Sequence, residues 1–212
     1  MSLKNVLIFG DSYSTFEGYI PEGFLPYYFK KGREETDVDK VEQTWWYQLM
    51  EETGSNLVLN NSWSGSTISY TGYRGDCSET SSFICRLHKL IDADFFKTHS
   101  IDTAFVFGGL NDTWANSPIG KMQFSDWEKQ DLFSVLPAIC YFMDKLRAQL
   151  PNAQIICILN TELKEEIEDA LRAASERYNA HWIQLKDIDK CSGHPTIKGM
   201  AQIKKQVLEN LP

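Results

Sequence analysis

Short apolar runs alternate with longer amphipathic stretches along the chain. The apolar runs have the length and character of buried strands in a parallel sheet, and they cover residues 6–9, 57–60, 103–107, 153–159 and 181–185. The stretches between them carry apolar residues at helical spacing, and they cover residues 44–53, 81–91, 125–150, 164–178 and 196–211. Strands that alternate with helices predict βα units. We therefore expect one domain over residues 1–212, a flavodoxin-like three-layer α/β/α sandwich with a five-stranded parallel sheet.

Two of the amphipathic stretches allow finer predictions. Ser125 and Glu128 form a capping-box pattern, which predicts that the long helix begins there. Pro137 should then start a new helical segment or kink this one. In the helix over residues 81–91 the polar side chains are expected on the solvent side, and these are Arg86, His88 and Lys89.

The stretch over residues 13–40 shows no regular pattern and is rich in glycine, proline and aromatic residues. Long loops without structure of their own are uncommon in compact domains unless they have a function. This loop leaves the sheet at the carboxyl end of the first strand. It therefore forms either part of a substrate-pocket wall or an ordinary surface loop held down by its aromatic side chains.

The charge balance and hydropathy exclude several kinds of partner. The chain has 21 Lys and Arg against 29 Asp and Glu, a formal net charge of -8, which disfavours nucleic acid and anionic membranes because both are bound by clustered basic residues. No stretch approaches the ~20 apolar residues that a membrane span requires. Residues 1–5 lead into the first strand with no signal peptide, so we expect a cytoplasmic protein. A secreted or periplasmic location would require that a signal had been removed, and the oligomeric state does not follow from the sequence.

The cysteines predict reduced thiols. Their number, five, is odd, and no CxxC pair occurs. Cys140 and Cys157 lie in apolar runs and are expected in the core. We therefore expect a reducing compartment and no disulfide framework.

Polar residues follow the predicted strands in a pattern that suggests chemistry. Ser12 follows the first strand, Gly65 the second, Asn111 the third and His194 the fifth. The carboxyl ends of parallel strands share one edge of a sheet, where ligands bind in open α/β folds. A hydroxyl, an imidazole, a side-chain amide and free backbone N–H groups at one edge are what acyl transfer needs: a nucleophile, a general base and oxyanion donors.

Four blocks resemble the motifs of one family, the GDSL or SGNH hydrolases, over nearly the whole chain. They are Gly10-Asp11-Ser12, the turn over residues 61–67 that carries Gly65, Gly109-Leu110-Asn111-Asp112, and His194-Pro195-Thr196 with Gly199 following. The resemblance implies that Ser12 is the nucleophile and His194 the base. It also implies an oxyanion hole formed by the N–H groups of Ser12 and Gly65 and the amide of Asn111.

One position departs from the family pattern. The family usually has an aspartate three residues before the histidine, and here that residue is Cys191. In a triad the acid orients the imidazole and stabilises the imidazolium, which a neutral thiol does poorly. Either a backbone carbonyl orients His194 in a Ser–His dyad, or Asp189 or Asp187 replaces the acid, or catalysis is weak. The last case gives the alternative of an inactive ligand-binding protein with this fold.

The reaction expected from the resemblance is hydrolysis of a carboxylic ester, either a small molecule or a carbohydrate ester. A short acyl group such as acetyl on a carbohydrate is our first expectation, because Tyr13, Trp63 and Trp114 would suit a sugar face or an acyl chain. No metal or cofactor is expected, since the four histidines lack ligand spacing. A flavodoxin-like nucleotide-binding domain is disfavoured because no glycine-rich phosphate loop occurs.

Overall fold

The computed structural model of the protein describes residues 3–212. Its centre is a five-stranded parallel sheet with the strand order β2-β1-β5-β6-β7. The strands are β1 (Asn5–Gly10), β2 (Asn56–Ser62), β5 (Thr103–Phe107), β6 (Gln154–Leu159) and β7 (His181–Gln184). The fold class and the five strands predicted from the apolar runs are confirmed.

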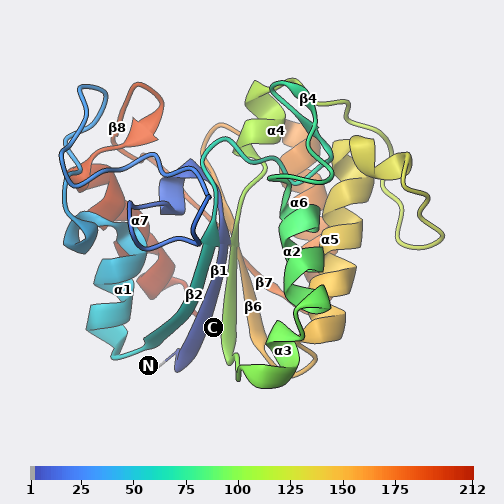
Figure 1. The fold of residues 1–212 in the computed structure, drawn as a ribbon, viewed down its shortest axis with the longest axis horizontal. Helices are drawn as coiled ribbons and strands as arrows, with labels where there is room; N and C mark the ends of the chain where they lie inside the picture. The colour runs from blue at the N-terminus through green and yellow to red at the C-terminus, as the bar shows by residue number, and fades with distance from the viewer. Residues whose placement is uncertain (1–2) are drawn as a thin grey trace.

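Helices cover both faces of the sheet (Figure 1). On one face lie α1 (Trp45–Thr53) and α7 (Ile197–Glu209), and on the other lie α2 (Phe83–Asp92), α5 (Val135–Gln149) and α6 (Glu165–Arg177). Two short helices, α3 (Phe95–Thr98) and α4 (Leu110–Trp114), flank β5 in the sequence. No helix within residues 3–212 is long and apolar enough to cross a membrane.

The central strand β1 shows why its sequence is apolar throughout. Leu7 and Phe9 belong to the core cluster under α2, α5 and α6, whereas Val6 and Ile8 belong to the cluster under α1 and α7. Side chains alternate between the two faces of a strand, and both faces are buried here. A continuous apolar run is therefore what this position in the sheet requires.

Two small antiparallel hairpins lie above the carboxyl edge of the sheet. One pairs β3 (Thr71–Gly72) with β4 (Gly75–Asp76), and the other pairs β8 (Lys190–Cys191) with β9 (His194–Pro195). Figure 1 shows β4 and β8 on opposite sides of this edge. The edge is thus flanked on one side by the hairpin that carries His194 and on the other by the β3–β4 hairpin.

The long helix predicted from residue 125 begins ten positions later, at Val135. Asp126 has a left-handed φ of 57°, which a helix cannot accommodate. The Glu128 N–H donates to the carboxylate of Asp131 at 2.8 Å, so the capping box with Ser125 does not form. Pro137 lies in the first turn of α5, where its missing N–H is tolerated, and the predicted new helical start is confirmed.

The solvent-facing side predicted for residues 81–91 is wrong in two places. Arg86 is only 1% exposed, and its contacts belong to the site described below. His88 is half-buried, with Nε2 3.0 Å from the hydroxyl of Tyr141. Lys89 is exposed as predicted. Cys140 and Cys157 lie in the core as predicted, with free thiols.

Candidate active site

Ser12 and His194 meet at the carboxyl edge of the sheet. Ser12 begins a short 3₁₀ turn, Ser12–Ser14, directly after β1, and the Nε2 atom of His194 lies 2.9 Å from its Oγ. The backbone at Gly10 packs closely against Ser62, and a Cβ at position 10 would lie 2.4 Å from the Ser62 Oγ. Only glycine fits there, so the chain can deliver Ser12 to the edge on a rigid turn.

Asp11 braces this turn. Its carboxylate accepts a hydrogen bond of 3.0 Å from the N–H of Tyr13 and so caps the 3₁₀ turn. Burial raises the pKa of Asp11 to about 7, against the opposing effects of the Tyr13 N–H and the positive charge of Arg86. Asp11 has no described contact with His194, which fits a structural role for this carboxylate.

The imidazole of His194 is held by a carbonyl and an aromatic ring. Its Nδ1 lies 3.2 Å from the carbonyl oxygen of Ser192, so Nδ1 carries the proton in this bond and Nε2 is free to accept from Ser12. The ring stacks on Tyr27 with centroids 3.5 Å apart and an interplanar angle of 7°. Burial lowers the pKa of His194 to about 4, although the Ser192 carbonyl opposes this, and Arg33 and Lys190 lower the pKa further.

Neither the thiol of Cys191, which occupies the position of the usual acid, nor the carboxylate of Asp189, one of the two candidate substitutes, makes a described hydrogen bond to the imidazole of His194. Cys191 pairs with His194 across the β8–β9 hairpin through the backbone, and its side chain is exposed. The carboxylate of Asp189 accepts a hydrogen bond from the Thr196 hydroxyl and lies 3.7 Å from the Nζ of Lys198. Among residues 3–212 no carboxylate hydrogen-bonds to His194. The contact with the Ser192 carbonyl fits the carbonyl-oriented imidazole among the alternatives, and a working Ser–His dyad stays a prediction.

Gly65 lies in the turn after β2, and Asn111 lies at the start of α4 directly after β5, so both follow strand ends as predicted. Gly65 has a φ of 79°, and no atom lies within 4 Å of where its Cβ would be, so its backbone is open to a ligand. The side-chain Oδ1 of Asn111 accepts a hydrogen bond of 2.9 Å from the hydroxyl of Tyr73. The NH₂ group of Asn111 has no partner within the described part of the chain, and it is available to donate.

Asp112, next to Asn111, anchors the turn that follows Gly65. Its buried carboxylate accepts hydrogen bonds from the Ile68 N–H at 2.8 Å, the Ser69 N–H at 3.0 Å and the Ser69 hydroxyl at 2.8 Å. Burial raises the pKa of Asp112 to about 6, and these hydrogen bonds oppose the rise. Because Asn111 and Asp112 are neighbours in one motif, the predicted donor Asn111 is linked to the turn that follows Gly65.

Arg86, predicted on the solvent side of its helix, is buried and contacts both turns of the site. Its guanidinium donates to the carbonyls of Gly10 at 3.2 Å and Asn61, and to the Ser66 hydroxyl at 3.0 Å. It thereby joins the turn before Ser12 to the turn that carries Gly65. Burial lowers the pKa of Arg86 to about 9, which leaves it charged at neutral pH. The sequence did contain an indication of this burial: Arg86 follows Phe83 by three positions and therefore shares its apolar helix face.

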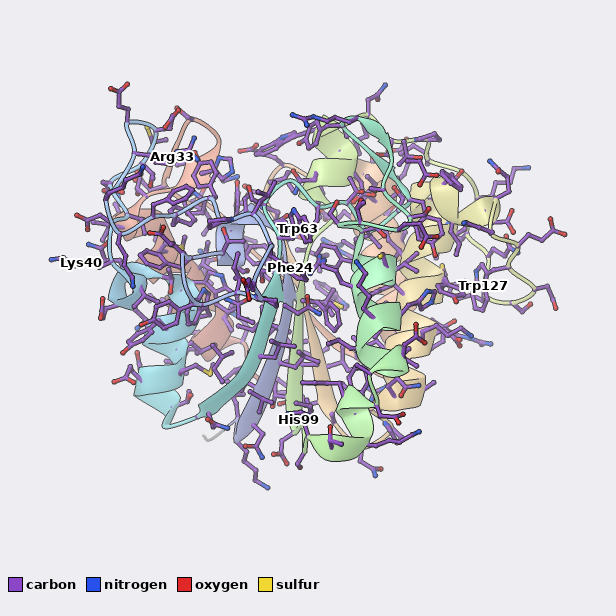
Figure 2. The ribbon with its side chains drawn as sticks, in the orientation of Figure 1. Phe24, Arg33, Lys40, Trp63, His99 and Trp127 are labelled. Atoms are coloured by element: carbon purple, nitrogen blue, oxygen red, sulfur yellow. The ribbon has the colours of Figure 1, made fainter. Side chains whose placement is uncertain are left out.

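A hollow of about 410 Å³ opens beside the predicted oxyanion donors. It is lined by Trp63, Gly65 and Tyr73, and by the turn of the β3–β4 hairpin. Figure 2 shows Trp63 above the carboxyl end of the sheet beside Phe24, and their ring centroids are 4.4 Å apart. Of the aromatic residues expected near the pocket, Trp63 lines this hollow.

The other two aromatic residues expected near the pocket lie on the histidine side. Trp114 is 37% exposed, and its ring centroid is 5.9 Å from that of His194. Tyr13 is fully buried, with its ring centroid 5.5 Å from that of His194. Tyr13 therefore cannot form a platform for a sugar or an acyl chain, and that expectation is wrong.

The chain resembles known proteins over nearly its whole length. A family model described as GDSL-like Lipase/Acylhydrolase matches residues 4–211. A structure assigned as a GDSL-like lipase from Bacteroides ovatus is 44% identical, with a TM-score of 0.89 over 99% of this chain and 98% of that chain. A second such structure, from Bacteroides uniformis, is 44% identical, with a TM-score of 0.90 over 98% of this chain and 95% of that chain. An acetyl xylan esterase, Est2A, from the rumen bacterium Butyrivibrio proteoclasticus is 18% identical, with a TM-score of 0.61 over 99% of this chain and 63% of that chain. No curated protein matches the chain.

Proposed function

Since the chain belongs to the GDSL-like lipase/acylhydrolase family and is an ester hydrolase, we propose that it forms an acyl-enzyme on Ser12 with His194 as general base. The observation that carries this proposal is the 2.9 Å distance between the Nε2 of His194 and the Oγ of Ser12. This is hydrogen-bond distance for a nucleophile and its base. The proton on Nδ1, directed at the Ser192 carbonyl, leaves Nε2 as the accepting nitrogen.

The first half of the reaction forms the acyl-enzyme. As Ser12 Oγ bonds to the ester carbonyl carbon, its proton passes to His194 Nε2, and the carbonyl oxygen becomes an oxyanion. The N–H groups of Ser12 and Gly65 and the NH₂ of Asn111 donate to that oxygen. When the tetrahedral intermediate collapses, Nε2 returns the proton to the departing alkoxide, and the alcohol leaves.

The second half of the reaction releases the acid. Water loses a proton to His194 Nε2 as it attacks the acyl carbon, and the same donors stabilise the second oxyanion. Ser12 Oγ then takes the proton back and the carboxylic acid departs. Because the leaving alcohol must be protonated by His194, the alcohol lies on the histidine side. The acyl group lies on the side of the hollow beside Gly65 and Tyr73.

For the substrate we propose a short-chain acyl ester, with an acetyl group on a carbohydrate as the first choice. Trp114, which is partly exposed beside His194, would offer a ring face to a sugar alcohol on the leaving-group side. The similarity in fold to the acetyl xylan esterase agrees with this choice.

Hydrolysis of p-nitrophenyl acetate and p-nitrophenyl butyrate tests this proposal, with acetate release from acetylated xylan as the carbohydrate assay. We expect the wild type to hydrolyse these esters, the acetate faster than the butyrate. Ser12→Ala and His194→Ala should lose this activity. Ser14→Ala, two residues along the same turn, is the matched control and should retain activity. If neither the wild type nor Cys191→Asp hydrolyses any of these esters, a ligand-binding role replaces this proposal.

A further inference from the structure

We propose that three tyrosines, Tyr13, Tyr27 and Tyr28, position His194 in place of the missing triad acid. All three come from the loop over residues 13–40, whose role the sequence left open. The proposal rests on the proposed function of Ser12 and His194. The three tyrosines act on the β8–β9 hairpin and are positioning residues, since none of their hydroxyls makes a described hydrogen bond to Ser12 Oγ.

Each tyrosine contacts one of three consecutive residues in the β8–β9 hairpin. The hydroxyl of Tyr13 donates to the carbonyl of Gly193. The hydroxyl of Tyr28 donates to the carbonyl of Pro195 at 3.1 Å. The residue between these two carbonyls is His194, whose ring stacks on Tyr27. The hairpin is therefore fixed on both sides of the histidine and across the face of its ring.

The tyrosines are themselves firmly held. Tyr13 and Tyr28 are fully buried, and the ring of Tyr13 packs edge-on against Phe107 at 5.7 Å. The N–H of Tyr27 donates to the hydroxyl of Thr15 at 2.8 Å, which ties this part of the loop to the turn that carries Ser12. Side chains locked by packing can hold a catalytic group in one geometry.

Arg33 holds Tyr27 from the other side. Its guanidinium carbon lies 4.2 Å from the centroid of the Tyr27 ring, and its NH1 donates to the Tyr27 carbonyl at 3.2 Å. His194 occupies one face of that ring, so the guanidinium lies on the opposite face. Figure 2 shows Arg33 in the loop over residues 13–40, on the side of the molecule that carries β8. The stack of Arg33, Tyr27 and His194 leaves the imidazole little freedom to tilt.

These contacts supply only one of the two roles of a triad acid. A carboxylate orients the imidazole and also stabilises the imidazolium by its charge. The charged groups that act on His194 are Arg33 and Lys190, which disfavour the imidazolium, and Glu162, which favours it weakly. The tyrosines therefore contribute orientation, and the loss of orientation should lower kcat with little effect on KM.

Substitution of Tyr27 separates positioning from general stability. The hydroxyl of Tyr27 makes no hydrogen bond among residues 3–212, so Tyr27→Phe keeps the ring stack, whereas Tyr27→Leu removes it. We expect Tyr27→Leu to lower kcat about 10-fold to 100-fold with KM within about twofold of the wild-type value. Tyr27→Phe should keep nearly all of the wild-type kcat. The control is Tyr19→Leu in the same loop, whose ring contacts Phe16 and Trp46, and it should leave kcat unchanged.

The decisive variant combines two substitutions. If Tyr27 replaces an acid, Cys191→Asp should raise kcat by a larger factor in the Tyr27→Leu background than in the wild type. An equal factor in both backgrounds would overturn the proposal. So would an unchanged kcat in folded Tyr27→Leu, or a rise in KM alone, which would make Tyr27 a substrate contact.

A readout independent of activity separates this proposal from the proposed function. NMR titration of the imidazole C–H resonances of His194 should show a higher pKa in Tyr27→Leu than in the wild type, because the ring is then less shielded from water. Melting curves identify any variant that fails to fold, and Tyr27→Phe remains as a folded comparison. If Ser12→Ala retains esterase activity while this shift is seen, the proposed function fails and the positioning contact stands. An unchanged titration would contradict the positioning.

Discussion

The Nε2 of His194 lies 2.9 Å from the Oγ of Ser12, although 182 positions separate the two residues in the chain. Ser12 reaches this point on a turn directly after β1. His194 reaches it on a hairpin held from the loop over residues 13–40 by the hydroxyls of Tyr13 and Tyr28. The first strand and the end of the chain thus form one site because both lead to the same edge of the sheet.

We expect the amide of Asn111 to stabilise the transition state of the chemical step more than it helps to bind the substrate. Asn111→Ala removes the NH₂ group that is left free by the Tyr73 contact, and we expect kcat to fall by about 10² to 10³ with the fold unchanged. Steady-state kinetics on p-nitrophenyl acetate measure this. Asn116→Ala, five positions further on and exposed, is the control. A loss confined to KM would show that Asn111 binds the substrate without stabilising the oxyanion.

The pH dependence of kcat/KM should follow the lowered pKa of His194. Only the neutral imidazole accepts the proton of Ser12, so the rate falls as the pH falls through this pKa. Since burial lowers the pKa to about 4, we expect the acidic limb to lie near that pH. In Cys191→Asp the added carboxylate favours the imidazolium, and the limb should move to higher pH.

Asp11 provides the control for this pH profile. Its pKa of about 7 could produce a separate limb near neutrality. Asp11→Asn removes that titration and keeps an oxygen that can accept from the Tyr13 N–H. A limb that stays near the ordinary histidine value of 6.5 in both the wild type and Asp11→Asn would contradict the described environment of His194.

Arg86 should matter for stability more than any other charged residue near the site. Its removal takes one donor from each of the buried carbonyls of Gly10 and Asn61, and the Gly10 carbonyl keeps the N–H of Trp63. We expect Arg86→Met to cost about 3–5 kcal/mol of unfolding free energy. Arg86→Lys should recover only part, because an ammonium cannot reproduce the planar set of contacts. Urea denaturation measures both, with exposed Arg74→Met as the control. Equal midpoints for Arg86→Met and the wild type would refute this role.

The sequence alone predicted the sheet and the residues that meet at its edge. Strands such as β1 are buried on both faces, so their apolar runs are easy to identify. Once a parallel sheet was expected, Ser12, Gly65, Asn111 and His194 had to follow strand ends on the same edge. The four blocks that they belong to resembled the GDSL or SGNH hydrolases, and the family model confirms that resemblance.

The remaining features depend on contacts that have no local signature. The acceptors for Arg86 are mostly backbone carbonyls, such as that of Gly10, and any residue type could supply them. The stacking of Tyr27 on His194 depends on the path of a loop without periodicity. The late start of α5 follows from the left-handed backbone at Asp126, which the capping pattern did not reveal.

Covalent labelling tests the central claim, that Ser12 is a nucleophile activated by His194, most directly. The protein is incubated with diisopropyl fluorophosphate, and the adduct is located by intact mass and peptide mapping. We predict a single phosphoryl adduct on Ser12, absent in Ser12→Ala and formed far more slowly in His194→Ala. No adduct on the folded wild type, or an adduct on another serine such as Ser14 or Ser192, would contradict the account.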